Sequence, residues 1–201
     1  MRPFLALPLA LLLGGCTTIR LTEPPQTATE QLLVTTAVDH AIARIDPQLP
    51  RGTKVFLDTQ FYDSAPADTL PKYTIGALRA QLLTLGLALV DDRKEAQAIL
   101  ELRSGAQSID HQSRLFGLPA IPIPIPLAGT VTTPEIALLA IDRQNGVAKL
   151  ALTPYWTANG ALAGAVQTER VEYGMSTRVK YSVLFISWTN DDLRPDLQPA
   201  P

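Results

Sequence analysis

The sequence predicts an α/β fold: a mixed, partly antiparallel sheet of about five to six strands with two helices packed on one face. Two segments, 29–45 and 73–85, carry apolar residues at the spacing of an amphipathic helix, and β-rich runs separate and follow them. The expected order is helix, strand, helix, short strand, strand, hairpin and strand. With 201 residues, of which 46% are hydrophobic and 18% charged, the chain has the size and composition of one globular domain.

The first helix is expected to take Thr29 as its N-terminal cap and to end before Pro47. Its apolar positions recur at helical spacing and are Val34, Val38, Ala41, Ile42 and Ile45. The run Lys54–Asp58 that follows is short, apolar and β-rich, which is typical of a buried strand.

The second helix is expected over Tyr73–Leu85, with Gly86 at the position after the C-terminus where glycine is favoured. Leu87–Val90 then supplies a short strand. From Ala98 onward apolar and polar residues alternate, which predicts a strand with one solvated side.

A hairpin is predicted from two strand-like runs, Glu135–Asp142 and Val147–Trp156, that flank the dipeptide Asn145-Gly146. Asn-Gly tolerates the positive φ angles of tight hairpin turns. After a Gly/Ala-rich loop at 159–165, the alternating segment 178–188 reads as the last strand. The folded domain is therefore expected over residues 29–190, with a frayed tail at 191–201.

The N-terminus, MRPFLALPLALLLGGC, has one cation and an apolar run too short to cross a bilayer, so residues 1–15 read as a signal peptide. Leu13, Gly14, Gly15 and Cys16 resemble the lipobox of bacterial lipoproteins. The resemblance implies cleavage before Cys16, a diacylglycerol on its sulfur and an acyl chain on the new amino terminus. The alternative is an ordinary secreted protein with a free cysteine.

The residues after the cysteine bear on location. Enterobacterial lipoproteins retained in the inner membrane carry an aspartate there, whereas this chain has Thr17. The resemblance therefore implies an outer-membrane protein on the periplasmic face, tethered by residues 16–28, with the membrane as a partner through Cys16. No cofactor beyond these lipids is expected.

The charge and cysteine content argue against several classes of partner and site. The 17 basic and 19 acidic residues provide no polybasic surface, which argues against nucleic acid as a partner. A single cysteine excludes an intramolecular disulfide, a CxxC redox motif and a Cys-rich zinc site.

Four segments carry a wider resemblance: KVFLD, LGLALVD, AQAILELRSG and IALLAIDRQNGVAKL. In this order they resemble the small periplasmic α/β domain shared by the TolB amino-terminal domain and the CsgG-type lipoproteins. The chain also resembles a group of proteobacterial lipoproteins of uncharacterised function that have a Pro/Ile-rich loop. Neither resemblance brings an activity.

Catalytic and metal-binding residues are not assigned. His40 and His111 are the only histidines, and neither lies in a metal-binding motif. Four aspartates fall at or just past predicted strand ends, where catalytic carboxylates occur but where aspartate also commonly starts turns: Asp58, Asp91, Asp92 and Asp142. A hydrolase that uses Asp58 or Asp91 with His111 would require these groups to converge in one cleft.

The segment 118–127 alternates proline with apolar residues, so it is expected to be an extended ribbon that cannot enter a central strand. Two interpretations stand: the ribbon packs back onto the sheet, or it docks onto a protein, a second copy or the lipid surface. The candidate docking residues are Leu118, Pro119, Ile121, Pro122, Ile123, Pro124, Ile125 and Pro126.

These features predict an outer-membrane-anchored lipoprotein that acts by binding, as an accessory or assembly factor of the cell envelope, rather than as an enzyme. One alternative is an oligomerising CsgG-like subunit, and another is a periplasmic hydrolase. Against a pore-forming subunit, the sequence shows no long pair of alternating strands with an apolar side.

Overall fold

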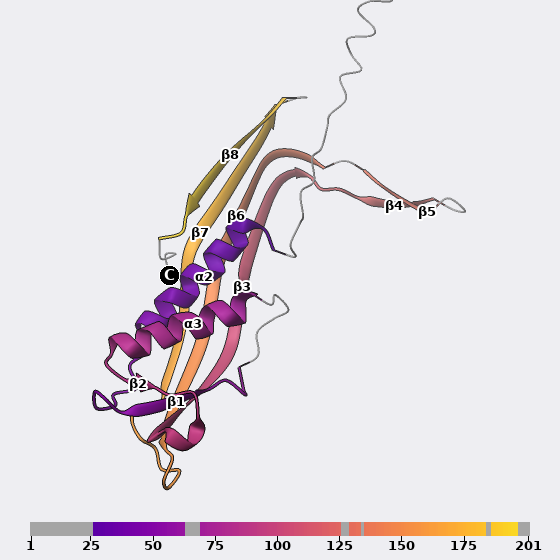
Figure 1. Ribbon diagram of the computed structural model, residues 1–201. Helices are drawn as coiled ribbons and strands as arrows, with labels where there is room; N and C mark the ends of the chain where they lie inside the picture. The colour runs from indigo at the N-terminus through magenta and orange to yellow at the C-terminus, as the bar shows by residue number, and fades with distance from the viewer. Residues whose placement is uncertain (1–25, 63–68, 126–128, 134, 184–185, 197–201) are drawn as a thin grey trace, which may run out of the picture.

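The computed structural model describes residues 26–62, 69–125, 129–133, 135–183 and 186–196 (Figure 1). Two helices lie on one face of a mixed six-stranded sheet, which confirms the predicted fold class. The strand order is β2-β1-β3-β6-β7-β8, and β4 and β5 form a separate two-stranded sheet. The elements are α2 (Ala28–Ala43), β1 (Lys54–Asp58), α3 (Thr69–Thr84), β2 (Ala88–Leu89), the 3₁₀ turn η2 (Arg93–Glu95), β3 (Ala98–Leu118), β4 (Pro122–Ile125), β5 (Gly129–Thr132), β6 (Ile136–Trp156), β7 (Gln167–Val183) and β8 (Ile186–Arg194).

Strand direction divides the main sheet into two parts. β1 pairs in parallel with β2 and with the first four residues of β3. The pairs β3–β6, β6–β7 and β7–β8 are all antiparallel. Parallel pairing needs crossover connections, and α3 supplies the one between β1 and β2.

Nearby residues determine where α2 begins and where α3 ends. The cap of α2 is Thr27 rather than the predicted Thr29, because Thr27 and Glu30 form a reciprocal capping box. α3 begins earlier than the predicted Tyr73, and it ends, as predicted, before Gly86, whose φ of 85° suits a residue just past a helix.

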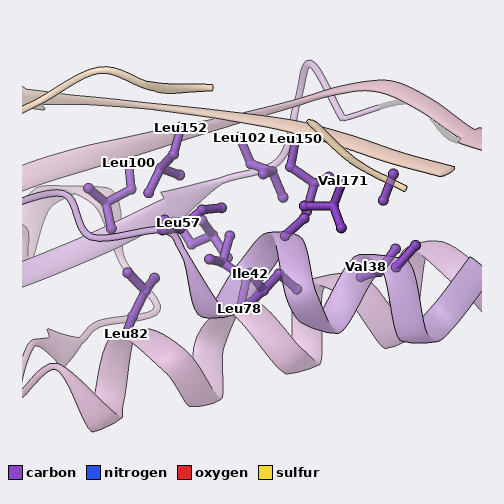
Figure 2. Packing of buried hydrophobic residues seen from close by; sticks show 14 of the residues in the cluster. Val38, Ile42, Leu57, Leu78, Leu82, Leu100, Leu102, Leu150, Leu152 and Val171 are labelled. Carbon is purple, nitrogen blue, oxygen red and sulfur yellow. The ribbon is translucent and has the colours of Figure 1, made fainter. Parts of the chain in front are cut away.

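The core lies between the helices and the lower half of the sheet (Figure 2). The apolar stripe predicted for the first helix is buried there, including Val34, Val38 and Ile42. Leu78 and Leu82 of α3 fill the space beside it. The sheet contributes Leu57, Leu100, Leu102, Leu150, Leu152 and Val171.

The predicted hairpin at Asn145-Gly146 is wrong, because β6 runs through this dipeptide as one strand from Ile136 to Trp156. The reason is packing by α2. A Cβ atom on Gly146 would lie 2.1 Å from the carbonyl oxygen of Leu33, so only glycine lets the helix approach here. The glycine therefore marks a close contact between helix and sheet and not a turn.

The C-terminal part of the chain also differs from the prediction. The segment expected as one strand, 178–188, contains the end of β7 and the start of β8, which pair with each other. β8 continues to Arg194, so residues expected to fray are paired in the sheet. Residues 197–201 lie outside the described part of the chain.

The long strands extend well past the helices (Figure 1). β3 and β6 each contain 21 residues, roughly 70 Å at 3.3 Å per residue, whereas the 16 residues of α2 span roughly 24 Å. The sequence did not predict strands of this length, because polar residues in mid-strand hide their continuity. No helix in the described ranges is long and apolar enough to cross a membrane.

Candidate functional site

Exposed apolar side chains gather where the sheet extends past the helices, at the C-terminal ends of β3 and β7 and the N-terminal ends of β6 and β8. We call this part of the sheet the apolar end. Directly opposed residues of antiparallel strands share a face, and Phe116, Leu139, Tyr181 and Trp188 form one such row. This row lies on the face opposite the helices. Phe116 is 70% exposed, and Tyr181 stacks on Trp188 with ring centroids 5.9 Å apart. The apolar end comprises Phe116, Leu118, Ile136, Leu138, Leu139, Tyr181, Ile186 and Trp188.

The β4–β5 hairpin continues the apolar end away from the domain (Figure 1). Ile121, Ile123 and Ile125 are between 42% and 52% exposed, and Val131 opposite Ile123 is 53% exposed. The described part of the ribbon therefore does not pack back onto the sheet. Pro126 lies outside the described residues.

The prolines of β4 occupy the outward-facing backbone positions. Ile121 directs both its backbone N–H and its carbonyl toward Thr133, so by alternation Pro122 and Pro124 face outward. Proline has no N–H group. The free edge of β4 between Pro122 and Pro124 thus offers carbonyls but no donors.

Charged residues are few at the apolar end: Glu135 precedes Ile136 at the start of β6, and Lys180 lies next to Tyr181 on β7. Residues 115–134 and 181–190 contain no Asp, Glu, Lys, Arg or His. The next row toward the domain on the aromatic face begins with Arg114, and on the helix face Asp142, Arg178 and Asp191 lie side by side. The sheet therefore passes from a charged band to a mostly apolar end within one or two residues.

A polar hollow of about 480 Å³ lies on the helix face, between the start of α2 and this charged band. Its lining residues include His111, Asp142, Ser176, Arg178 and Asp191. The His111 Nε2 atom is 3.7 Å from Asp142 Oδ1. Arg178 donates to both carboxylate oxygens of Asp191 at 2.8 and 3.4 Å, and these hydrogen bonds raise the pKa of the Arg178 guanidinium.

The histidine and the serine that line this hollow are too far apart to act together in catalysis. His111 and Ser176 share a row, but Gln144 stands between them, so their strands are roughly 10 Å apart. A base must lie within hydrogen-bond distance of the proton that it removes. Among the described residues, no group of three or more His, Cys, Asp or Glu is placed to hold a metal ion.

The residues named for a hydrolase do not converge. Asp58 pairs with Glu101 on β3, and His111 lies ten residues farther along that strand, roughly 30 Å away. Asp58 accepts a hydrogen bond from Arg93 at 3.0 Å, and the same guanidinium donates to the Tyr155 hydroxyl at 2.8 Å. Asp58 therefore ties η2 to the sheet, and the Asp58–His111 combination is excluded.

The other aspartates and His40 also have structural partners. Asp91 pairs with Arg79 at 3.3 Å, and Asp92 caps η2 by accepting from the Lys94 amide. The His40 ring stacks on Tyr173 at a centroid distance of 3.4 Å, which attaches α2 to β7.

A comparison with known protein families gives one match. The profile of the family of unknown function DUF6655 aligns with residues 10–168, more than half of the chain. The chain belongs to this family. No curated protein matches it. Membership in DUF6655 brings no activity.

The sequence did not predict the aromatic row, although an uncharged stretch with two aromatic members of the row is visible in it. Residues 181–188 read YSVLFISW, an uncharged stretch that lies within the segment predicted as the last strand, 178–188. Tyr181 and Trp188 share a row with Phe116 only through the pairing of β3 with β6, β6 with β7 and β7 with β8, which no local pattern reveals. The predicted lipidation motif, Leu13, Gly14, Gly15 and Cys16, lies outside the described residues.

Proposed function

We propose that this protein is a lipid-anchored accessory factor of the bacterial cell envelope that acts by binding through its apolar end. The observation that carries the proposal is the exposure of Phe116 and Leu118 on β3, whose other end forms the core, together with that of Trp188 on β8. Exposed apolar surface of this extent is costly in water, and it marks an interaction site in most proteins that retain it. The separation of Asp58 from His111 removes the chief support for a hydrolase.

The anchor is proposed at Cys16, with the domain in the periplasm and attached to the outer membrane. The lipobox-like motif supports this, and the DUF6655 match begins at residue 10 and therefore includes Cys16. Several acyl chains, each CH₂ contributing about 0.8 kcal/mol on burial, would hold the chain at the membrane almost permanently.

Metabolic labelling with palmitate tests the anchor. Cys16→Ser should abolish labelling, whereas Thr18→Ser, two residues away, should leave it unchanged. Labelling that persists in Cys16→Ser would refute the anchor.

Site-specific photo-crosslinking in intact cells tests binding by the apolar end. A photoreactive phenylalanine analogue at Phe116 should give discrete adducts, while the same analogue at Leu83 should give none. Leu83 is a fair control because it is 56% exposed but lies on α3, among the covering helices. Identical adduct patterns from both positions would contradict the proposal.

The open edges of β3 and β8 favour a second candidate function, that of an oligomerising subunit. Among the described strands, only β6 pairs with β3 between Ile109 and Leu118, so the opposite edge of β3 is open there. β8 is the last strand on the other side and is exposed throughout. Long open edges promote pairing between chains, and β8 of one copy could add to β3 of the next.

The mass of the intact protein in mild detergent tests this second function. A subunit predicts a ring or larger assembly that Ile109→Pro reduces to monomers, because proline removes an amide donor from the β3 edge. Glu135→Pro, outside the strands, serves as the control. An intact protein that stays monomeric at all concentrations would rule out the oligomerising subunit.

A further inference from the structure

We propose that the apolar end, together with the β4–β5 hairpin, lies in the surface of a lipid bilayer. This inference deepens the proposed function, because it names the partner of the same surface, and its step concerning the tether rests on the anchor at Cys16. Four features favour the bilayer over a protein partner: three belong to the described residues, and the fourth adds the length of chain between Cys16 and α2.

The first feature is that both faces of the apolar end are mostly apolar, with Glu135 and Lys180 as the charged residues beside them. On the face away from the helices stand Phe116 and Leu118, and on the other face Leu115 and Ala140. A protein partner covers one face of a hairpin, whereas a bilayer surrounds both. The one cation in this part of the sheet, Lys180, lies opposite Ala140, where a long side chain can reach the headgroups.

The second feature is the order of residue types along the strands. Tyr181 and Trp188 stand between the charged residues Arg178 and Asp191 on one side and the uncharged segment 182–187 on the other. Tyrosine and tryptophan concentrate at the boundary between lipid headgroups and acyl chains, because their rings are apolar and carry one polar group. The sheet therefore has an aromatic level that matches a membrane interface.

The third feature is the donor-free edge of β4. A peptide that adds to a sheet edge needs donors from that edge, and the backbone of Pro122 and Pro124 has none. In lipid the same absence is favourable, since an unpaired N–H in hydrocarbon costs on the order of several kcal/mol. By alternation the edge of β5 retains the N–H groups of Thr130 and Thr132, so the hairpin fits the interfacial region and not the bilayer centre.

The fourth feature is the position of the start of α2. Glu30 in its first turn accepts a hydrogen bond from Gln144 at 3.3 Å, and Asp142 on the same strand is three residues, roughly 10 Å, from the aromatic row. The ten residues between Cys16 and Thr27 span at most roughly 35 Å when extended. A lipid on Cys16 and the apolar end can thus reach one membrane together.

Quenching of tryptophan fluorescence by brominated lipid tests the proposal. The chain has two tryptophans, and Trp156 lies at the other end of β6, roughly 55 Å along the strand from the row of Trp188. Trp156→Phe leaves Trp188 as the probe, and Trp188→Phe leaves Trp156 as the matched control. Each intact, lipidated variant is reconstituted in phosphatidylcholine vesicles with plain or brominated acyl chains.

Trp188 emission should fall by roughly half in the brominated vesicles, as expected for a ring buried about 5–10 Å into the interface, while Trp156 emission stays the same. Adding Ile121→Ser, Ile123→Ser and Ile125→Ser should weaken the quenching although the protein remains on the vesicles. Equal emission from Trp188 in both lipids would overturn the proposal. A blue shift of Trp188 that depends on protein concentration but not on bromine would instead assign the surface to a second copy, which also overturns it.

Failure of the anchor and failure of this inference give different results. Loss of the anchor removes palmitate labelling and the bound protein itself. Loss of bilayer contact leaves labelled protein on the vesicles with unquenched Trp188.

Discussion

The two ends of β3 differ in what surrounds the same kind of residue. Leu100 and Leu102 are completely buried beneath α2 and α3, whereas Leu118 on the same strand is 62% exposed. Strand length explains the contrast, because a 21-residue strand extends far beyond a 16-residue helix that covers it. One sheet therefore combines a part that stabilises the fold with a part whose apolar residues remain available for binding.

At the covered end, specific contacts between α2 and the sheet stabilise the fold in addition to the burial of apolar side chains. Gly146 lets the backbone of α2 touch β6, and the ring of His40 stacks on Tyr173 of β7. At the uncovered end, the described contacts are those between the strands themselves and the Tyr181–Trp188 stack. We expect substitutions to separate the two ends by their effect on stability.

The largest difference should come from one substitution made at each end of β3. Leu102→Ala should lower the free energy of unfolding by about 2–5 kcal/mol, because it leaves a cavity in the core. Leu118→Ala should change it by less than about 0.5 kcal/mol, as an exposed position does. Urea denaturation measures both, and equal losses would contradict the division of the sheet.

The next largest effect on stability should come from the contact between α2 and β6. Gly146→Ala should cost about 1–3 kcal/mol, since the added Cβ would overlap the Leu33 carbonyl and push α2 away. Gly76→Ala is the control: it lies inside α3 with open space around it and should stabilise by about 0.5–1 kcal/mol. A neutral Gly146→Ala variant would show that α2 does not need this approach.

A smaller, pH-dependent effect is expected where the two helices meet. The Tyr73 hydroxyl donates to Asp39 at 2.7 Å, and burial, followed by this hydrogen bond and the charge of Asp39, raises the pKa of Tyr73 to about 12. The folded protein therefore holds this proton more tightly than the unfolded chain, whose tyrosines titrate near 10. The stabilisation is complete below pH 10 and is lost as the pH rises toward 12.

Denaturation at several pH values checks this expectation. Between pH 10 and 12 the free energy of unfolding should fall more in the wild-type protein than in Tyr73→Phe, which has no proton to lose. Curves that fall in parallel would mean that Tyr73 contributes nothing to the pH dependence.

Local patterns were enough to predict the helices and the first strand. The apolar stripe from Val34 to Ile45, the glycine at 86 and the β-rich run Lys54–Asp58 each act over a few residues, and each prediction was confirmed apart from shifts of helix ends. Asn145-Gly146 was misread, because the same dipeptide serves a tight turn or a close contact, and only the position of Leu33 in space decides between them. The ribbon was recognised as a candidate surface, but its continuation into the aromatic row depends on strand register.

The measurement that tests the central claim most directly is the unfolding free energy of the variant with Ile121→Ser, Ile123→Ser and Ile125→Ser. If the uncovered end serves binding and not folding, the variant should unfold within about 0.5 kcal/mol of the wild-type protein, because all three side chains are already exposed. A loss of about 2 kcal/mol or more, in the range of a core truncation, would show that these isoleucines pack in the fold and would contradict the account.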